Sequence, residues 1–269
     1  MIDRDFSLYK HIVIDVQESW PIELVNLLKD SKENLMNYLE EEKSIDEAAI
    51  ENVLLRVNRP MNKYQQGWDE LITRIKSIIS KYKFIGFHCK RLTKEEVTEV
   101  LINGLTPLNE ELLSKKLNVL LDLNFIDCDE YHKMLVNEQV NEDGRKDKVF
   151  TFHEIHTLTD ESGLKRLFRC WGGEYFYYGN EEKRDFRDKY FHKYFHIGKA
   201  TILITSHQYE DVQHRDIEIK TIKNFLFYNT DYRGNDFDNW HHKPVKVLNY
   251  IDEDSDLFYE LTGYRTWTI

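Results

Sequence analysis

The hydrophobic period of this chain changes at Lys83, and the change separates a helical region from a region rich in strands. Before it, apolar residues recur at helical spacing and form one face of a helix: Trp68, Leu71, Ile72, Ile75, Ile78 and Ile79. After it, residues 84–89 (FIGFHC) form a short apolar run that ends in polar residues, which is typical of a buried strand. We therefore predict helices over about residues 21–82 and a strand that begins at residue 84.

A helix is predicted directly after this strand. Thr93 and Glu96 have the spacing of a capping box, in which the threonine side chain accepts a hydrogen bond from the backbone N–H of Glu96. The helix is expected to stop at Asn103-Gly104, because glycine adopts the conformation that ends many helices. Residues 84–105 are thus predicted to fold as strand, tight loop, helix and glycine stop.

The rest of the chain alternates less regularly. Further helices are predicted at residues 109–121 and 131–138, and strands at residues 149–155, 200–206, 216–220, 225–228, 245–251 and 264–269. Helices followed by a run of strands give an α+β layout. We predict two parts: an N-terminal helical segment at residues 1–82, and a domain at residues 83–269 with a helical insertion at about residues 107–147.

The composition argues against several classes of protein. A net charge of −11 and a pI of about 5.5 disfavour bulk binding to DNA or to an anionic membrane. No apolar run reaches the about 18 residues that a membrane span requires, and the first residues lack the pattern of a secretory signal. Three widely spaced cysteines argue against a disulfide framework. We expect a cytoplasmic protein without membrane contact.

Two short segments carry the residue types of a ligand site. His88 ends the predicted strand just before a capped helix, whose N-terminal N–H groups favour an anion. Residues 171–178 (WGGEYFYY) combine adjacent glycines, which permit close backbone approach, with aromatic side chains that pack against planar rings. Each pattern alone also fits ordinary core packing, so their combination carries the prediction.

Together the two segments resemble the ADP-ribosyltransferase superfamily, which has the fold of poly(ADP-ribose) polymerases and diphtheria toxin. FHCKRLT…EVLINGL is similar to its opening strand and helix, WGGEYFYYG to its Gly-rich second motif, and HIGKATILITS to the strand that follows. The likeness is nearest to bacterial members of the toxin or phage-defence type and covers about residues 84–106 and 165–269. It implies an α+β fold with split antiparallel β-sheets and NAD as the cofactor.

The resemblance also implies residue roles. His88 would hydrogen-bond the ribose of the nicotinamide half of NAD, and the Cys89 backbone would hold the nicotinamide amide. Arg91 would approach the pyrophosphate, since its guanidinium fork suits phosphate oxygens. Further cofactor contacts fall on the turn and the aromatic residues: Gly172, Tyr177 or Tyr175 stacked on the nicotinamide ring, and Tyr190 closing its other side.

The superfamily's third motif is an acidic residue or glutamine that stabilises the positive charge of the transition state as nicotinamide leaves. In GNDFDNWHHKPVKV the local pattern indicates Asp236 or Asp238. Glu218, on a predicted alternating strand, competes with them, and Glu174 in the second motif is a candidate for activating the acceptor nucleophile. The sequence does not choose among these carboxylates.

The expected function is NAD-dependent transfer of ADP-ribose to a protein or RNA acceptor, as in a toxin or an antiviral defence effector. The helices at residues 21–82 would bind a neutralising antitoxin partner or pack on the catalytic domain. Two alternatives remain open: a catalytically inactive module that binds NAD or ADP-ribose, and an RNA 2′-phosphotransferase-like enzyme. Resemblance of fold alone does not distinguish either alternative from the ADP-ribosyltransferase.

No metal site is predicted. His192 and His196 are four residues apart on a predicted helix but lack the His-Glu-x-x-His pattern. His153 and His156 match no metal-binding spacing. His241 and His242 are expected to form a surface pair or to line the cleft, and Cys170 is expected to be a packed thiol.

Overall fold

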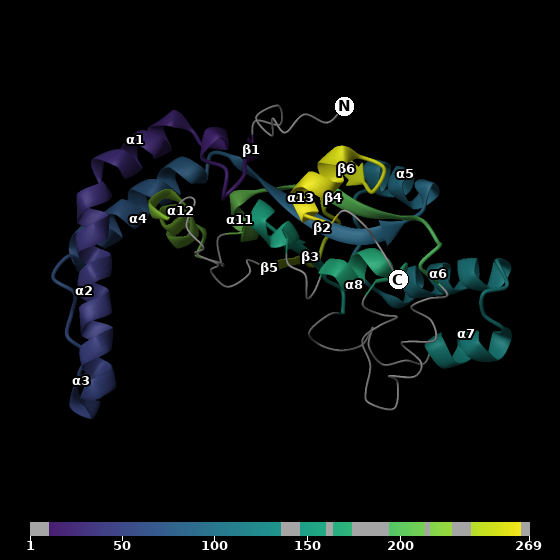
Figure 1. Cartoon of the computed structure of the whole chain (residues 1–269), viewed down its shortest axis with the longest axis horizontal. Helices are drawn as coiled ribbons and strands as arrows, with labels where there is room; N and C mark the ends of the chain where they lie inside the picture. Colours follow the sequence, from purple (N-terminus) through teal and green to yellow (C-terminus); the bar gives the residue numbers. More distant parts are fainter. Residues whose placement is uncertain are drawn as a thin grey trace. The chain divides into compact units, whose positions relative to one another are not determined.

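The computed structural model describes residues 11–135, 146–159, 164–173, 194–212, 216–227 and 238–264. The chain divides into two compact units, which we call the sheet unit and the helical unit (Figure 1). The sheet unit consists mainly of Phe84–His207 and Gly234–Ile269, and the helical unit of Ser7–Lys83 and Gln208–Arg233. The helical unit thus ends its first part at Lys83, next to the predicted boundary, and also takes in Gln208–Arg233, a stretch that the sequence places in the second domain.

Helices dominate the helical unit. After β1 (His11–Ile12) and the short 3₁₀ turn η2 (Gln17–Ser19), its elements are α1 (Ile22–Asp30), α2 (Lys32–Glu51), α3 (Val53–Val57), α4 (Gln65–Ile79), α11 (Tyr209–Val212) and α12 (Ile217–Leu226). The predicted apolar face of α4 is confirmed, because Leu71, Ile75 and Ile79 are buried. Tyr38 of α2 stacks on Trp68 of α4 with ring centroids 4.1 Å apart.

An antiparallel sheet forms the sheet unit. Five strands follow one another in the order β5 (Asp238–His241), β3 (Val149–Phe152), β2 (Lys83–Leu92), β4 (Lys199–His207) and β6 (Lys246–Asp252). β2 and β4 pair along nine positions, from Phe84 opposite His207 to Leu92 opposite Lys199. β2 is therefore the central strand, and its residues are buried along most of its length.

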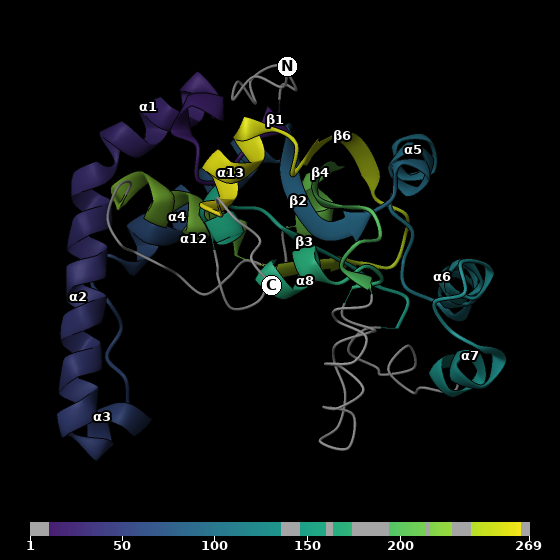
Figure 2. The same ribbon diagram turned by 45° about the vertical axis from the view of Figure 1, so that its right-hand side comes forward.

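Helices accompany this sheet. They are α5 (Lys94–Asn103), α6 (Glu110–Asp122), α7 (Cys128–Leu135), α8 (Leu164–Arg169) and α13 (Asp256–Thr262), with the short 3₁₀ helix η4 (Ile155–Thr159). Figure 2 shows α6 and α7, which lie within the predicted insertion, side by side. Among the described residues, no helix combines the length and the apolar character that crossing a lipid bilayer requires.

The predicted cap and stop of α5 are both confirmed. The Thr93 hydroxyl accepts from the Glu96 N–H at 3.2 Å, and the Glu96 carboxylate accepts from the Thr93 N–H at 2.9 Å. Gly104 ends the helix with a φ of 81°, and a Cβ there would lie 2.8 Å from the carbonyl oxygen of Val245. Glycine is thus required at this position by its backbone conformation and by steric contact.

The α+β class is confirmed, while two details of the sequence prediction are wrong. Residues 216–220 and 225–227 form α12 and its end rather than strands, because Ile217, Thr221 and Ile222 bury one helical face. The described strands also join one open antiparallel sheet instead of the expected split pair. Most of the last predicted strand, at residues 264–269, lies outside the described residues.

Candidate functional site

His88 lies on the central strand and is held in one tautomer. Its Nδ1–H donates to the carbonyl of Phe150 on β3 at 2.7 Å, so the lone pair of the neutral ring is on Nε2. Nε2 is buried and has no hydrogen-bond partner among the described residues. Burial, and to a lesser degree the charge of Lys90, lowers the pKa of His88 to about 4. The ring is therefore a neutral hydrogen-bond acceptor at physiological pH.

The start of the second segment singled out in the sequence, residues 171–173, lies beside the first. Arg91 of β2 and Trp171 form a parallel β-bridge, which places residues 171–173, here called the Gly-Gly turn, beside β2. Gly172 and Gly173 have φ values of 90° and 75°, a region that other residues rarely adopt. Trp171 is fully buried, so in this segment the first aromatic residue is core.

A buried ionic cluster supports this turn. The Glu96 carboxylate of α5 accepts from the Trp171 Nε1–H at 2.7 Å and from the Lys116 ammonium of α6. Lys116 Nζ also lies 4.5 Å from the centre of the Trp171 ring, within cation–π range. The cluster thereby fixes the start of the Gly-Gly turn to two helices of the sheet unit.

Lys90 lies between His88 and the Gly-Gly turn. It is two residues from His88 on the same strand, so the two side chains are on the same face of the sheet. Its Cε is 3.9 Å from the position that a Cβ of Gly173 would occupy. Burial and the nearby charge of Lys116 lower the pKa of Lys90 to about 7, against the opposing effect of Glu96. Sequence reasoning missed this lysine, although its two-residue spacing from His88 was visible.

Arg91 is not available for the pyrophosphate contact that the resemblance implies. It is on the opposite face of β2 from His88 and is only 5% exposed. Its guanidinium donates to the carbonyls of Ile197 and Phe168 and to the carboxylate of Glu253, each at 3.1 Å. These partners are part of the fold, so Arg91 acts as a structural residue that links β2 to α8, to the segment before β4 and to the turn after β6.

The cysteines of the sheet unit are packed thiols. Cys89 lies opposite Ile202 in the β2–β4 ladder, and burial raises the pKa of its thiol well above the usual range. Burial likewise raises the pKa of Cys170 to about 12, with a smaller opposing effect from Arg91. Neither group forms a thiolate nucleophile at neutral pH.

The structure places two of the acidic residues that were candidates for the catalytic carboxylate. Glu218 is on helix α12 of the helical unit, not on a late strand, and its buried carboxylate accepts a hydrogen bond from Tyr209. We therefore withdraw Glu218 as a catalytic residue. Asp238 is on β5 opposite Phe152 of β3. The other predicted residues of the site lie outside the described residues: Glu174, Tyr175, Tyr177, Tyr190 and Asp236.

A group that sequence reasoning missed lies on the same face of the sheet as His88. His153, His207 and His241 each offer a ligand atom, and these atoms lie within 4.8 Å of one another. The three histidines come from separate strands or strand ends, so their spacing in the chain gave no sign of a cluster. The repeated Thr-x-His pattern, Thr151-x-His153 and Thr205-x-His207, is the only signal in the sequence that links two of them.

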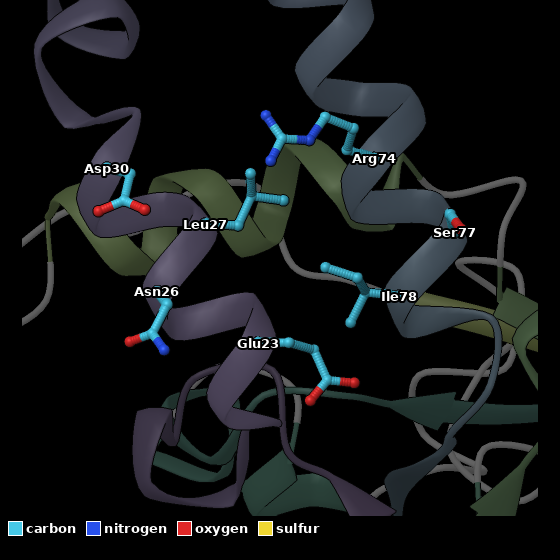
Figure 3. Close-up of a pocket in the computed structure, with 7 residues that line it drawn as sticks. All are labelled: Glu23, Asn26, Leu27, Asp30, Arg74, Ser77 and Ile78. Atoms are coloured by element: carbon cyan, nitrogen blue, oxygen red, sulfur yellow. The ribbon is translucent and has the colours of Figure 1, made fainter.

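A surface depression of about 510 Å³ lies in the helical unit between α1 and α4 (Figure 3). Its lining mixes two carboxylates, one guanidinium, polar and apolar side chains: Glu23, Asn26, Leu27, Asp30, Arg74, Ser77 and Ile78. None of the residues singled out in the sequence for catalysis or cofactor binding lines it.

The end of the α2–α3 hairpin exposes apolar side chains. Five of them are between 67% and 82% exposed: Ile50, Val53, Leu54, Val57 and Met61. Patches of this kind often mark contact surfaces. Nothing in the structure shows what covers this one, so the expected neutralising partner stays a prediction.

Comparisons of the chain with protein-family models, curated proteins and solved structures found no match.

Proposed function

We propose that the chain is an NAD-dependent ADP-ribosyltransferase whose nucleotide pocket is formed by β2 and the Gly-Gly turn. The observation that carries the proposal is the Arg91–Trp171 bridge, because it brings together two segments that are 80 residues apart in the sequence. These are the two segments that resemble the superfamily's NAD-binding motifs. The ADP-ribosyltransferase fold itself is part of the proposal.

His88 is suited to the ribose contact. Its Nε2 is a buried hydrogen-bond acceptor without a partner among the described residues. A ribose hydroxyl is a donor of the right kind, and leaving a buried acceptor unpaired costs about 1–3 kcal/mol. Binding the nicotinamide ribose would therefore satisfy an acceptor that the fold already orients.

Lys90 takes the place that the resemblance gave to Arg91. Its ammonium group is on the His88 face of β2 and near the Gly-Gly turn, whose positive-φ glycines allow close backbone approach. A cation beside such a turn stabilises a pyrophosphate, which carries negative charge throughout the neutral range. We assign Lys90 to the pyrophosphate and Arg91 to the fold.

In the proposed reaction, the glycosidic bond between the nicotinamide nitrogen and ribose C1′ breaks, and nicotinamide leaves with the bonding electron pair. The acceptor nucleophile attacks C1′ and loses its proton. A carboxylate near C1′ would stabilise the positive charge of this step. Asp238 on β5 and Asp236 are the remaining choices, and the acidic balance of the chain favours a protein acceptor over RNA.

The test uses purified full-length protein with NAD labelled in its adenosine half. We expect NAD to raise the melting temperature, nicotinamide to be released, and label to enter protein from a cell extract. His88→Ala and Lys90→Met should abolish all three effects. Lys94→Met, at an exposed lysine at the start of α5, should leave them unchanged.

The possible outcomes separate the alternatives. Binding without release of nicotinamide would identify an NAD-binding module and contradict the transferase. Label that enters RNA rather than protein would change the acceptor but keep the reaction. No thermal shift and no release of nicotinamide would refute the pocket.

A further inference from the structure

Three imidazoles converge on one face of the sheet unit. His153 directly follows β3, His207 ends β4, and His241 ends β5. The ring centroids of His153 and His207 are 4.7 Å apart, and those of His207 and His241 are 4.6 Å apart. His153 and His207 are fully buried, and His241 is half-buried.

We propose that His153, His207 and His241 bind one Zn²⁺ ion. Three neutral imidazoles form a known zinc ligand set that leaves the fourth position to water. Their ligand atoms already lie within 4.8 Å of one another, and a tetrahedral ion with bonds of about 2.0–2.1 Å needs them about 3.3 Å apart. Binding would therefore require the three rings to turn toward one another about their side-chain torsions.

Hydrogen bonds orient the rings for this role. The Nδ1–H of His153 donates to the carbonyl of Ile85 at 2.9 Å, which puts the lone pair on Nε2. Metal-binding histidines are typically fixed by such a bond from the other ring nitrogen. The Thr205 hydroxyl lies 2.8 Å from Nε2 of His207. The Thr151 hydroxyl lies 3.4 Å from Nε2 of His241 and 3.5 Å from Nε2 of His153, so it borders the proposed site.

The central strand has a glycine where the rings need space. Gly86 is paired with Thr205, and a Cβ at position 86 would lie 2.5 Å from Nε2 of His207. Glycine inside a strand costs about 0.5–1 kcal/mol relative to alanine. The imidazole above it gives a physical reason for this glycine, since any larger residue would displace the His207 ring.

The donor atoms favour an ion. Each of the three rings brings a nitrogen ligand atom into the same small volume. A divalent cation is the ligand that three converging lone pairs stabilise best, and imidazole nitrogen suits Zn²⁺ more than Mg²⁺ or Ca²⁺. The ion would also tie the short strands β3 and β5 to β4 across β2.

The test starts from tag-free full-length protein that is stripped with a chelator and dialysed. Zn²⁺ is titrated against a chromophoric chelator, and we expect one ion per chain together with a higher melting temperature. Co²⁺ should give the visible absorption bands of a four-coordinate site. His241→Ala should lower the affinity roughly a hundredfold or more, and the matched control His242→Ala should not, because His242 is an exposed neighbour outside the cluster.

X-ray absorption on the zinc-loaded wild type keeps the test independent of whether any variant folds. It should show three imidazole ligands with zinc–nitrogen distances of about 2.0–2.1 Å. Absence of tight binding by the wild type would overturn the proposal. Equal losses in His241→Ala and His242→Ala, or a spectrum without three imidazoles, would also overturn it. None of these outcomes depends on NAD, so the zinc site and the transferase are tested separately.

Discussion

The His207 ring packs directly against Gly86: a Cβ added at position 86 would lie 2.5 Å from Nε2 of that ring and 2.9 Å from the Thr205 hydroxyl. Gly86→Ala should therefore force the imidazole aside. We expect a loss of about 1–3 kcal/mol in the free energy of unfolding, as for other overpacked cores. Zn²⁺ affinity should fall roughly tenfold in the same variant. Urea unfolding and the chelator competition assay measure the two effects.

Gly67 is the matched control for Gly86. It is inside helix α4, and a Cβ there meets nothing within 4 Å. Gly67→Ala should stabilise the chain by about 0.5–1 kcal/mol, since alanine is favoured in helices. Equal effects of the two substitutions would contradict the steric role of Gly86.

Glu96 links three elements, and its removal should be costly. Glu96→Gln keeps a capping residue on α5 but leaves the Lys116 ammonium without its buried partner. We expect a loss of about 3 kcal/mol in unfolding free energy, the magnitude typical of breaking a buried ion pair. Glu99→Gln, which breaks the exposed pair with Lys115, should cost about 1 kcal/mol or less.

The Glu96 pair also predicts a response to acid. Burial alone would raise the pKa of Glu96, but Lys116 and the hydrogen bonds to Thr93 and Trp171 outweigh it and lower the pKa. Because the pKa of Glu96 is lower in the folded state, its ionised carboxylate stabilises the fold at pH values above the unfolded-state pKa of about 4.3. This stabilisation is lost as the pH falls through the folded-state pKa. The difference in the free energy of unfolding between the wild type and Glu96→Gln should therefore shrink below about pH 4. A difference that stays constant with pH would refute the assignment.

A substitution at Arg91 tests whether this residue stabilises the fold or binds the nucleotide. Arg91→Lys removes the fork that reaches the carbonyls of Phe168 and Ile197. We expect a lower melting temperature and a loss of about 2–4 kcal/mol in unfolding free energy, since buried acceptors lose their donors. The folded fraction should bind ADP-ribose as the wild type does. An unchanged melting temperature with lost binding would return Arg91 to the pyrophosphate.

Local signals in the sequence predicted the framework of the site. The Thr93–Glu96 capping box, the Gly104 stop and the apolar run of β2 depend on neighbours within a few residues, and the structure has all three. The pairing of His88 with the Gly-Gly turn came from resemblance, and the Arg91–Trp171 bridge places those segments side by side. Agreement is therefore best where the interactions are short-range.

The features that the sequence did not predict depend on contacts between residues that are distant in the chain. The alternation around Ile217 fits a strand as well as one face of a helix, and burial in the helical unit selects the helix. Arg91 suited a phosphate by residue type, but the register of β2 turns it to the face opposite His88. The His153–His207–His241 cluster exists only because three strands meet in one register, so no spacing in the chain predicts it.

Lys90 provides the sharpest test of the nucleotide pocket. Its pKa of about 7 means that the ammonium loses its proton near neutrality, whereas the pyrophosphate of ADP-ribose keeps its charge. Binding of ADP-ribose should therefore weaken about tenfold between about pH 6 and about pH 8. Among the described residues, the titratable groups that face Lys90 are Lys116, Glu96 and His88, and His88, with a pKa of about 4, is neutral throughout this range.

Lys90→Arg should remove this pH dependence while preserving affinity at the acidic end, because a guanidinium stays protonated throughout the range. Calorimetric titration with ADP-ribose at several pH values measures both proteins under the same conditions. The exposed control Lys94→Arg should retain the wild-type slope. If the wild type and Lys90→Arg show the same slope, the titrating group is not Lys90, and the assignment of this lysine to the pyrophosphate fails.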